Sequence, residues 1–157
     1  MKKIYIESLG CAKNQVDSEV LLAYADEEGY ERVENAEDAD VIVVNTCGFI
    51  ESAKEESINT FFALKERCPN AKIIMAGCLA QRYGKEMELD EADAIFGNHD
   101  LSLFPEVLRN IEKDERTVSV PEYPDPDRER DERKDLLSFP RSAYLKISEG
   151  CNHCCSY

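Results

Sequence analysis

The sequence predicts an α/β fold, a flavodoxin-like or Rossmann-like parallel sheet flanked by helices. Two observations support this prediction. Strand and helix patterns alternate over the first hundred or so residues, which is typical of a parallel sheet with helical crossovers. The runs at 41–44 and 73–75 are unbroken and apolar, as expected for strands that are buried on both faces. Right-handed crossovers between such strands then place helices on both sides of the sheet.

Each element follows from local patterning. The first helix has an apolar stripe that includes Val16 and Leu21, and Gly29 is a suitable stop. The expected strands cover residues 3–9, 30–33, 40–45, 71–76, and 94–96. The expected helices cover residues 14–28, 51–67, 81–87, and 101–112.

The chain changes character after this alternating region. Ten of the eleven residues from Asp125 to Asp135 are charged, with both signs mixed, and prolines interrupt the surrounding sequence. We therefore expect a first domain over 1–113, a solvated charged linker over 114–140, and the beginning of a second domain over 141–157. A further strand is expected at 143–147.

Composition limits the class of protein. The net charge of −14 disfavours sequence-independent binding to nucleic acid, because phosphates repel an acidic chain. No apolar run approaches the roughly 18 residues of a membrane span, and no signal peptide is apparent, so we expect a cytoplasmic protein without membrane association. Seven cysteines in such a protein indicate metal ligands, redox groups or core residues rather than disulfides.

Three cysteines occupy equivalent positions. Cys11, Cys47 and Cys78 each follow an expected strand and precede an expected helix. The carboxyl ends of parallel strands form the edge at which ligands bind, so the three should converge there. Helix N-termini at this edge should lower their thiol pKa values. The alternative is that each is a small buried apolar residue, as we expect for Cys68.

Two kinds of metal site are compatible with three cysteines. Zinc usually takes four ligands, and His99 is the local candidate for a fourth. A 4Fe–4S cluster held by three thiolates leaves one iron open for chemistry, which suits catalysis better.

The last residues carry a second cysteine pattern. Cys151 and Cys155 are spaced as C-x3-C, and a cysteine directly after Tyr157 would complete C-x3-C-x2-C. The completed pattern resembles the cluster motif of radical S-adenosylmethionine enzymes. The alternative is a cysteine-rich surface loop that binds zinc together with His153.

Six blocks of the sequence are distinctive when taken together. The blocks are Ser8-Leu9-Gly10-Cys11-Ala12-Lys13-Asn14, Asp17-Ser18-Glu19, Asn45-Thr46-Cys47-Gly48-Phe49-Ile50, Ala53-Lys54-Glu55-Glu56-Ser57-Ile58, Gly77-Cys78-Leu79-Ala80-Gln81-Arg82 and Glu149-Gly150-Cys151-Asn152. They resemble the methylthiotransferase family of the radical S-adenosylmethionine superfamily. The resemblance extends over nearly the whole chain and is closest to the branch that modifies an aspartate β-carbon in a small-subunit ribosomal protein.

The resemblance implies the cofactors. Cys11, Cys47 and Cys78 would hold an auxiliary 4Fe–4S cluster that carries the transferred sulfur. Cys151, Cys155 and a cysteine beyond the chain would hold a second 4Fe–4S cluster, which reduces S-adenosylmethionine to a radical. Residues 1–113 would be the methylthiotransferase domain, and 141–157 would be the start of a radical barrel.

The resemblance also implies the partners. The substrate would be a basic ribosomal protein of the small subunit, with flavodoxin or ferredoxin as electron donor, and this chain alone is expected to be inactive. Acidic residues clustered at 34–40 and 86–93 would attract a basic partner, or are simply solvated loops. The alternatives are a tRNA adenosine methylthiotransferase and a non-catalytic, metal-holding protein-binding module.

Overall fold

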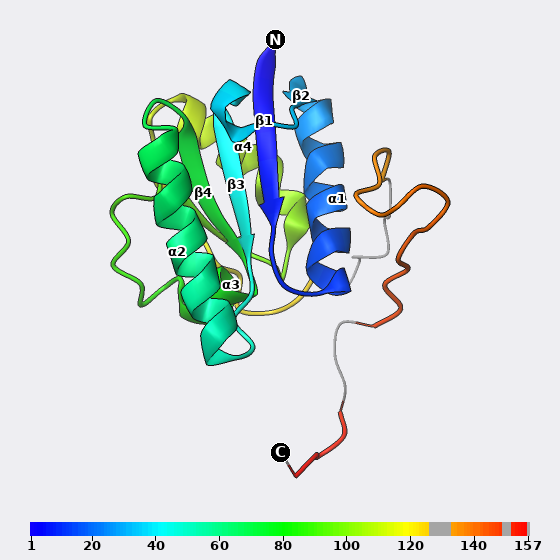
Figure 1. Cartoon of the computed structure of the whole chain (residues 1–157). Coiled ribbons are helices and arrows are strands. Elements are labelled where there is room, and N and C mark those ends of the chain that lie inside the picture. The colour runs from blue at the N-terminus through cyan, green and yellow to red at the C-terminus, as the bar shows by residue number, and fades with distance from the viewer. Residues whose placement is uncertain (126–132, 149–151, 157) are drawn as a thin grey trace.

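The computed structural model describes residues 1–125, 133–148 and 152–156. Within these residues a single sheet has six strands, all parallel, in the order β2-β1-β3-β4-β5-β6 (Figure 1). The strands are β1 (Lys2–Ser8), β2 (Tyr30–Arg32), β3 (Val41–Thr46), β4 (Lys72–Gly77), β5 (Ala94–Gly97) and β6 (Thr117–Ser119). The predicted flavodoxin-like or Rossmann-like α/β fold is confirmed.

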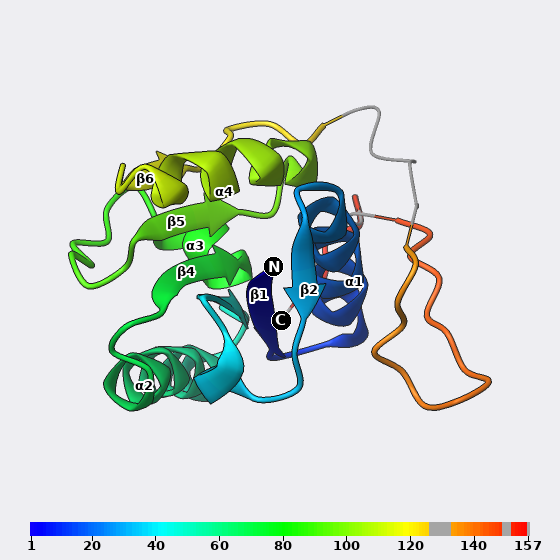
Figure 2. The same cartoon turned by 90° about the horizontal axis from the view of Figure 1, so that it is seen from above.

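Helices cover both faces of this sheet (Figure 2). One face carries α1 (Ala12–Glu27) and α4 (Phe104–Glu112), and the other carries α2 (Glu51–Arg67) and α3 (Cys78–Tyr83). Two short 3-10 turns, η1 (Ala36–Asp38) and η2 (Leu101–Leu103), complete the regular structure of the described residues.

The central strand β3 shows why the apolar runs are unbroken. Val41 and Val43 pack into the core beneath α1 and α4, whereas Ile42 and Val44 pack into the core beneath α2 and α3. All four are at most 4% exposed. Because successive side chains of a strand point to opposite faces, a strand covered on both sides needs apolar residues at every position.

The strand order creates a switch point beside β1. From β1 the chain crosses to β2 on one side, and then returns to β3 on the other. This is the flavodoxin-like order, in which ligands bind at the carboxyl ends of the strands that flank the reversal. The loops after β1 and β3 therefore form the place where a ligand is expected.

The helix after β4 starts earlier than predicted. We expected a helix over 81–87, but α3 begins at Cys78, directly after the strand. Gly77 makes this direct transition possible, because its φ of +92° is accessible to glycine and strained for other residues. A Cβ there would also lie 2.3 Å from the side-chain oxygen of Asn45. Cys78 is consequently the first residue of a helix rather than part of a loop.

The predicted boundary at residue 113 is wrong in one respect, since Thr117–Ser119 pairs with β5 and extends the sheet. This strand has only three residues, and its apolar residue Val118 is 46% exposed. The sequence therefore contains no periodic apolar pattern that would predict a strand here. The expected strand at 143–147 is not a strand in the structure. The central part of the expected linker, residues 126–132, lies outside the described residues.

Four residues of the segment 133–146 contact α1 or the core beneath it, whereas most of the others are exposed. The four are Arg133, Lys134, Leu137 and Lys146. Leu137 packs against the apolar core, and its backbone N–H donates a hydrogen bond to the Glu19 carboxylate at 2.8 Å. This packing explains why Asp17 and Glu19, in the middle of α1, are almost fully buried. The expectation of a fully solvated connector does not hold for this part of the chain.

Among the described residues, no helix combines the length and the apolar character needed to cross a membrane.

Candidate metal centre

Cys11, Cys47 and Cys78 lie at the same edge of the sheet. Cys11 is the N-cap residue of α1, Cys47 directly follows β3, and Cys78 opens α3. Cys11 is exposed, and the other two are partly exposed. The structure therefore brings each predicted cysteine to the carboxyl end of its strand, where solvent can reach it.

The loops that carry Cys11 and Cys47 are in contact. Gly10 has a φ of +89°, and a Cβ added to it would lie 2.7 Å from Cys47 Cβ and 3.1 Å from Cys47 Sγ. Real Cβ atoms are not found that close to other atoms, so only glycine allows this approach. Gly10 thus lets the first cysteine loop close onto the second.

Asn14 connects the three segments that carry Cys11, Cys47 and Cys78. Its side-chain amide donates hydrogen bonds to the backbone carbonyls of Leu9 at 2.9 Å and Thr46 at 2.8 Å. Its side-chain oxygen accepts a hydrogen bond from the Cys78 thiol at 3.3 Å. Since Asn14 is only 1% exposed, water does not compete for these contacts. Sequence reasoning missed this role, although a polar residue in the first turn of a buried helix was a possible signal.

Further buried polar contacts connect the end of β3 with α1 and the end of β1. Asn45 donates to the Asn14 carbonyl at 2.7 Å and to the Ser18 hydroxyl at 2.8 Å, and Ser18 donates to Ser8 at 2.9 Å. Asn45 Oδ1 is the one buried side-chain polar atom without a partner among the described residues. Sheet edge and α1 are thereby joined by polar contacts as well as by apolar packing.

Ser57 of α2 holds the backbone on both sides of Cys47. Its hydroxyl accepts a hydrogen bond from the Cys47 N–H at 3.0 Å and donates one to the Cys47 carbonyl at 3.1 Å. Ser57 is fully buried, so this clamp is shielded from water. The Cys47 side chain is therefore presented from a fixed backbone.

The electrostatics around Cys78 differ from the prediction. Burial raises the pKa of the Cys78 thiol above its ordinary value, and the negative charge of Asp17 raises it further. The charges of Cys47 and Cys11 also raise this pKa. Lys146 acts in the opposite direction and lowers it. We expected helix N-termini to lower the pKa, but the pKa of Cys78 is raised, with burial as the largest cause.

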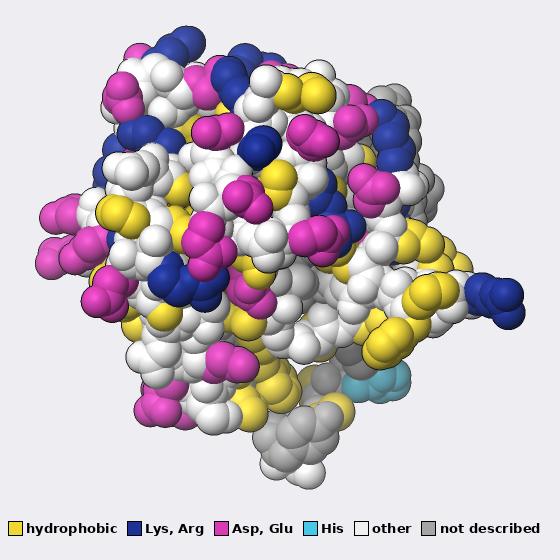
Figure 3. Space-filling view, turned by 45° about the horizontal axis from the view of Figure 1, so that its top comes forward, with side chains coloured by type: hydrophobic (Ala, Val, Ile, Leu, Met, Phe, Trp, Pro, Cys, Tyr) yellow, Lys and Arg dark blue, Asp and Glu magenta, His cyan; other side chains and the backbone are white. Residues whose placement is uncertain are grey.

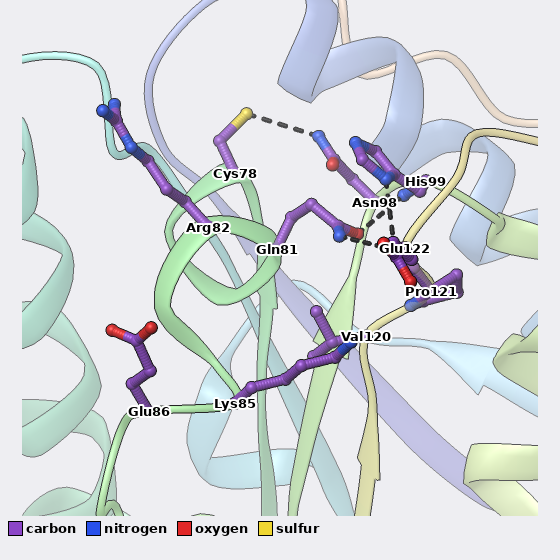
Figure 4. Close-up of a pocket in the computed structure, with 10 residues that line it drawn as sticks. All are labelled: Cys78, Gln81, Arg82, Lys85, Glu86, Asn98, His99, Val120, Pro121 and Glu122. Carbon is purple, nitrogen blue, oxygen red and sulfur yellow. Dashed lines mark hydrogen bonds between the residues drawn. The ribbon is translucent and has the colours of Figure 1, made fainter.

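A cavity of about 520 Å³ opens beside Cys78, on the side of β5 (Figure 4). The Asn98 side-chain amide donates a hydrogen bond to Cys78 Sγ at 3.3 Å across one end of this cavity. The His99 ring nitrogen Nδ1 lies 3.1 Å from the Pro121 carbonyl. His99, the predicted candidate for a fourth zinc ligand, therefore contacts the backbone through one of its two ring nitrogens.

A single ion and a 4Fe–4S cluster place different demands on three cysteines. No group of three or more Cys, His, Asp or Glu within residues 1–125, 133–148 and 152–156 is arranged to bind one metal ion. Sulfurs bound to one zinc lie within about 4 Å of each other, since each Zn–S bond is about 2.3 Å. A 4Fe–4S cluster takes each thiolate on a different iron, so its ligands need not meet at one point.

The remaining cysteines separate into two groups. Cys68 is 8% exposed and packs into the core beneath α2, as expected for a residue without a metal-binding role. Cys155 is exposed, as is Cys154, and the described C-terminal residues extend beyond the carboxyl edge of the sheet (Figure 1). Cys151, the other predicted ligand of the second cluster, lies outside the described residues.

Comparison with known proteins defines the class. Residues 3–97 match the model of a family described as Uncharacterized protein family UPF0004. Since this match covers more than half of the chain, the chain belongs to that family.

Individual relatives extend the comparison. The chain is similar to proteins named "Ribosomal protein uS12 methylthiotransferase RimO". Identity is 44% over 157 residues to that of Treponema denticola, covering 94% of this chain and 33% of the relative. It is 46% over 155 residues to that of Syntrophomonas wolfei (96% and 35%) and 44% over 166 residues to that of Clostridioides difficile (100% and 36%). The chain thus spans about a third of the length of the curated relatives it matches.

Proposed function

We propose that this chain is the part of a ribosomal protein methylthiotransferase that holds an auxiliary 4Fe–4S cluster on Cys11, Cys47 and Cys78. The observation that carries the proposal is the position of Cys11, Cys47 and Cys78 at one edge of the sheet, where the buried side chain of Asn14 joins the three segments. The similarity to proteins named as uS12 methylthiotransferases supports the choice of reaction.

Two 4Fe–4S clusters and S-adenosylmethionine would supply the radical and the sulfur in the complete enzyme. The described residues would provide the setting for the first cluster. Gly10 would leave room beside Cys47, and Ser57 would fix the Cys47 backbone. Cys78 would give up its proton on binding iron, and the raised pKa of its thiol makes this step dependent on pH.

The second cluster would use Cys151, Cys155 and a cysteine beyond Tyr157. A flavodoxin or ferredoxin would supply electrons to it, in the cytoplasm. We propose residues 141–157 as the start of the domain that carries it, and β6 as the last strand of the domain that carries the first cluster.

The proposed substrate is a basic ribosomal protein. The acidic loops at 34–40 and 86–93 precede β3 and β5, so they end at the edge of the sheet opposite the cysteines. Figure 3 shows Asp and Glu side chains spread over the visible face, with Lys and Arg among them. The substrate assignment therefore rests on the similarity to the named relatives and not on an acidic patch beside the site.

Iron content tests the proposed ligands. The chain is reconstituted anaerobically with iron and sulfide, and single Cys11→Ala, Cys47→Ala and Cys78→Ala variants are compared with wild type. Each should lose most of the iron and the charge-transfer absorption of the cluster. Cys68→Ala is the control and should retain both. Wild-type iron in Cys47→Ala, or loss in Cys68→Ala, contradicts the assignment.

A further inference from the structure

The sulfur of Cys78 lies between two side-chain amides that present opposite atoms to it. Asn14 offers its carbonyl oxygen, and Asn98 offers its NH2 group, each at 3.3 Å from Sγ (Figure 4 shows the contact with Asn98). The contact with Asn14 needs a proton on the sulfur, since a carbonyl oxygen can only accept. The contact with Asn98 needs no such proton.

Asn14 cannot turn its amide toward the sulfur without loss. Its NH2 group is committed to the backbone carbonyls of Leu9, which is part-buried, and Thr46, which is buried. Rotation would leave both carbonyls without these donors, at a cost of about 1–3 kcal/mol for the buried Thr46 carbonyl. When Cys78 is a thiolate, Asn98 is consequently the amide that faces it with a donor.

The position of Asn98 is itself fixed relative to Cys78. Gln81 lies one turn further along α3, and its side-chain oxygen accepts from the His99 N–H at 3.1 Å. The Gln81 amide donates to the Pro121 carbonyl at 2.8 Å, and His99 contacts the same carbonyl. The loop that carries Asn98 is therefore tied to the helix that begins with Cys78.

On these observations we infer that Asn98 is a positioning residue that stabilises the thiolate of Cys78 and raises the reduction potential of the cluster bound there. A donor to a ligand sulfur withdraws charge from the cluster, and hydrogen bonds to sulfur are among the determinants of its potential. Hydrogen-bonding partners of metal ligands also strengthen binding, typically by about 10–100-fold. This inference rests on the proposed function.

The test uses the whole chain, reconstituted anaerobically, with two readouts: the midpoint potential and the rate of iron loss to a chelator. Asn98→Leu keeps the approximate volume and removes the donor. It should lower the potential and release iron about tenfold faster. Asn98→Asp adds a negative charge in place of the donor and should lower the potential further. Asn98→Gln retains an amide and should restore part of the wild-type value.

Two further variants separate a local effect from a general one. Gln81→Leu frees the loop of Asn98 and should shift the potential in the same direction as Asn98→Leu. Asn35→Leu is the control, because Asn35 is exposed at the opposite end of the domain, and it should change neither readout.

The outcomes are distinct. Faster iron loss at an unchanged potential in Asn98→Leu means that Asn98 only supports the structure, which overturns the inference. Equal potentials in the Leu, Asp and wild-type chains also overturn it, while the cysteine ligands stand if Cys78→Ala has lost the cluster. A Cys78→Ala chain with wild-type iron overturns the proposed ligand set and this inference together.

Discussion

Lys146 Nζ lies 2.7 Å from Asp17 Oδ1, and the two side chains are only 12% and 4% exposed. A second pair, Arg133 with Glu19, is as close at 2.6 Å and equally buried, at 9% and 0%. Both carboxylates belong to α1, and both cations belong to the segment 133–146. The two ion pairs therefore attach Arg133 and Lys146, at the two ends of the segment 133–146, to α1.

Glu19→Gln should release residues 133–146 from α1. The substitution removes the Glu19 carboxylate that pairs with Arg133, and one-sided loss of a buried pair typically costs about 3–5 kcal/mol. Because the segment can detach and expose Arg133 to water, most of this cost should appear as local opening. Hydrogen–deuterium exchange should become at least tenfold faster across 134–146 and remain unchanged in β3 and β4.

The control for this prediction is Glu27→Gln on the same helix, where the side chain is exposed. It should not alter exchange in residues 134–146. Equal exchange in the Glu19→Gln and wild-type chains would show that the ion pair does not hold the segment.

The metal-free chain should show slow alkylation of Cys78 at neutral pH. Its pKa is raised, chiefly by burial, so a smaller fraction is thiolate at any given pH than for an ordinary cysteine. The rate should rise as the pH passes above 9, the ordinary value of the group. Removal of the nearby positive charge by Lys146→Met should raise the pKa further and slow the reaction again.

Mass spectrometry of iodoacetamide-treated peptides provides the measurement. Cys68 is the internal control, because its burial should keep it unreactive at every pH at which the fold persists. A Cys78 rate that is already maximal at pH 7 would contradict the raised pKa.

Gly10→Ala should both destabilise the domain and weaken iron binding. The added methyl group would overlap Cys47, and the positive φ adds backbone strain of about 1–3 kcal/mol. Gly29→Ala is a matched control, since Gly29 has a similar φ of +84° and no atom within 4 Å of the added Cβ. The midpoint temperature of thermal unfolding should be lower than wild type in both variants, and the decrease should be larger for Gly10→Ala.

Iron content separates the two glycine variants. Gly29→Ala should reconstitute with wild-type iron, because the strain lies away from the cysteine loops. Gly10→Ala should bind substantially less. The same iron content in both variants would mean that the close approach of Gly10 to Cys47 is not needed for the site.

The complete protein should modify a ribosomal protein and not tRNA. Offered a peptide from uS12 and an unmodified tRNA in competition, with S-adenosylmethionine, reductant and a sulfur source, it should add a methylthio group to the peptide aspartate. Mass spectrometry of both substrates gives the result. Methylthio addition to tRNA adenosine alone would assign the protein to the tRNA-modifying branch.

Local sequence patterns were enough to predict most of the sheet. Apolar runs such as 41–44 identify strands, because burial on both faces requires apolar residues at consecutive positions. The strand-end positions of Cys11, Cys47 and Cys78 follow from the same patterns, since the ends of parallel strands share an edge. Local sequence patterns are therefore enough to predict that the three cysteines lie at one edge of the sheet.

Other features depend on partners that are distant in the chain. Asp17 and Glu19 resemble solvent-facing residues of an amphipathic helix. Their contacts with Lys146, Arg133 and Leu137, more than a hundred residues away, account for their burial. The strand Thr117–Ser119 likewise exists because β5 offers it an open edge.

The surroundings of Cys78 were also decided by tertiary structure. Sequence alone suggested a lowered pKa at a helix start, but enclosure by other elements raises it. The opposed amides of Asn14 and Asn98 come from α1 and from the loop after β5, and they meet at one sulfur because the sheet order places those elements together. Local patterns thus determined which residues reach the edge, whereas long-range packing decided which atoms face each sulfur there.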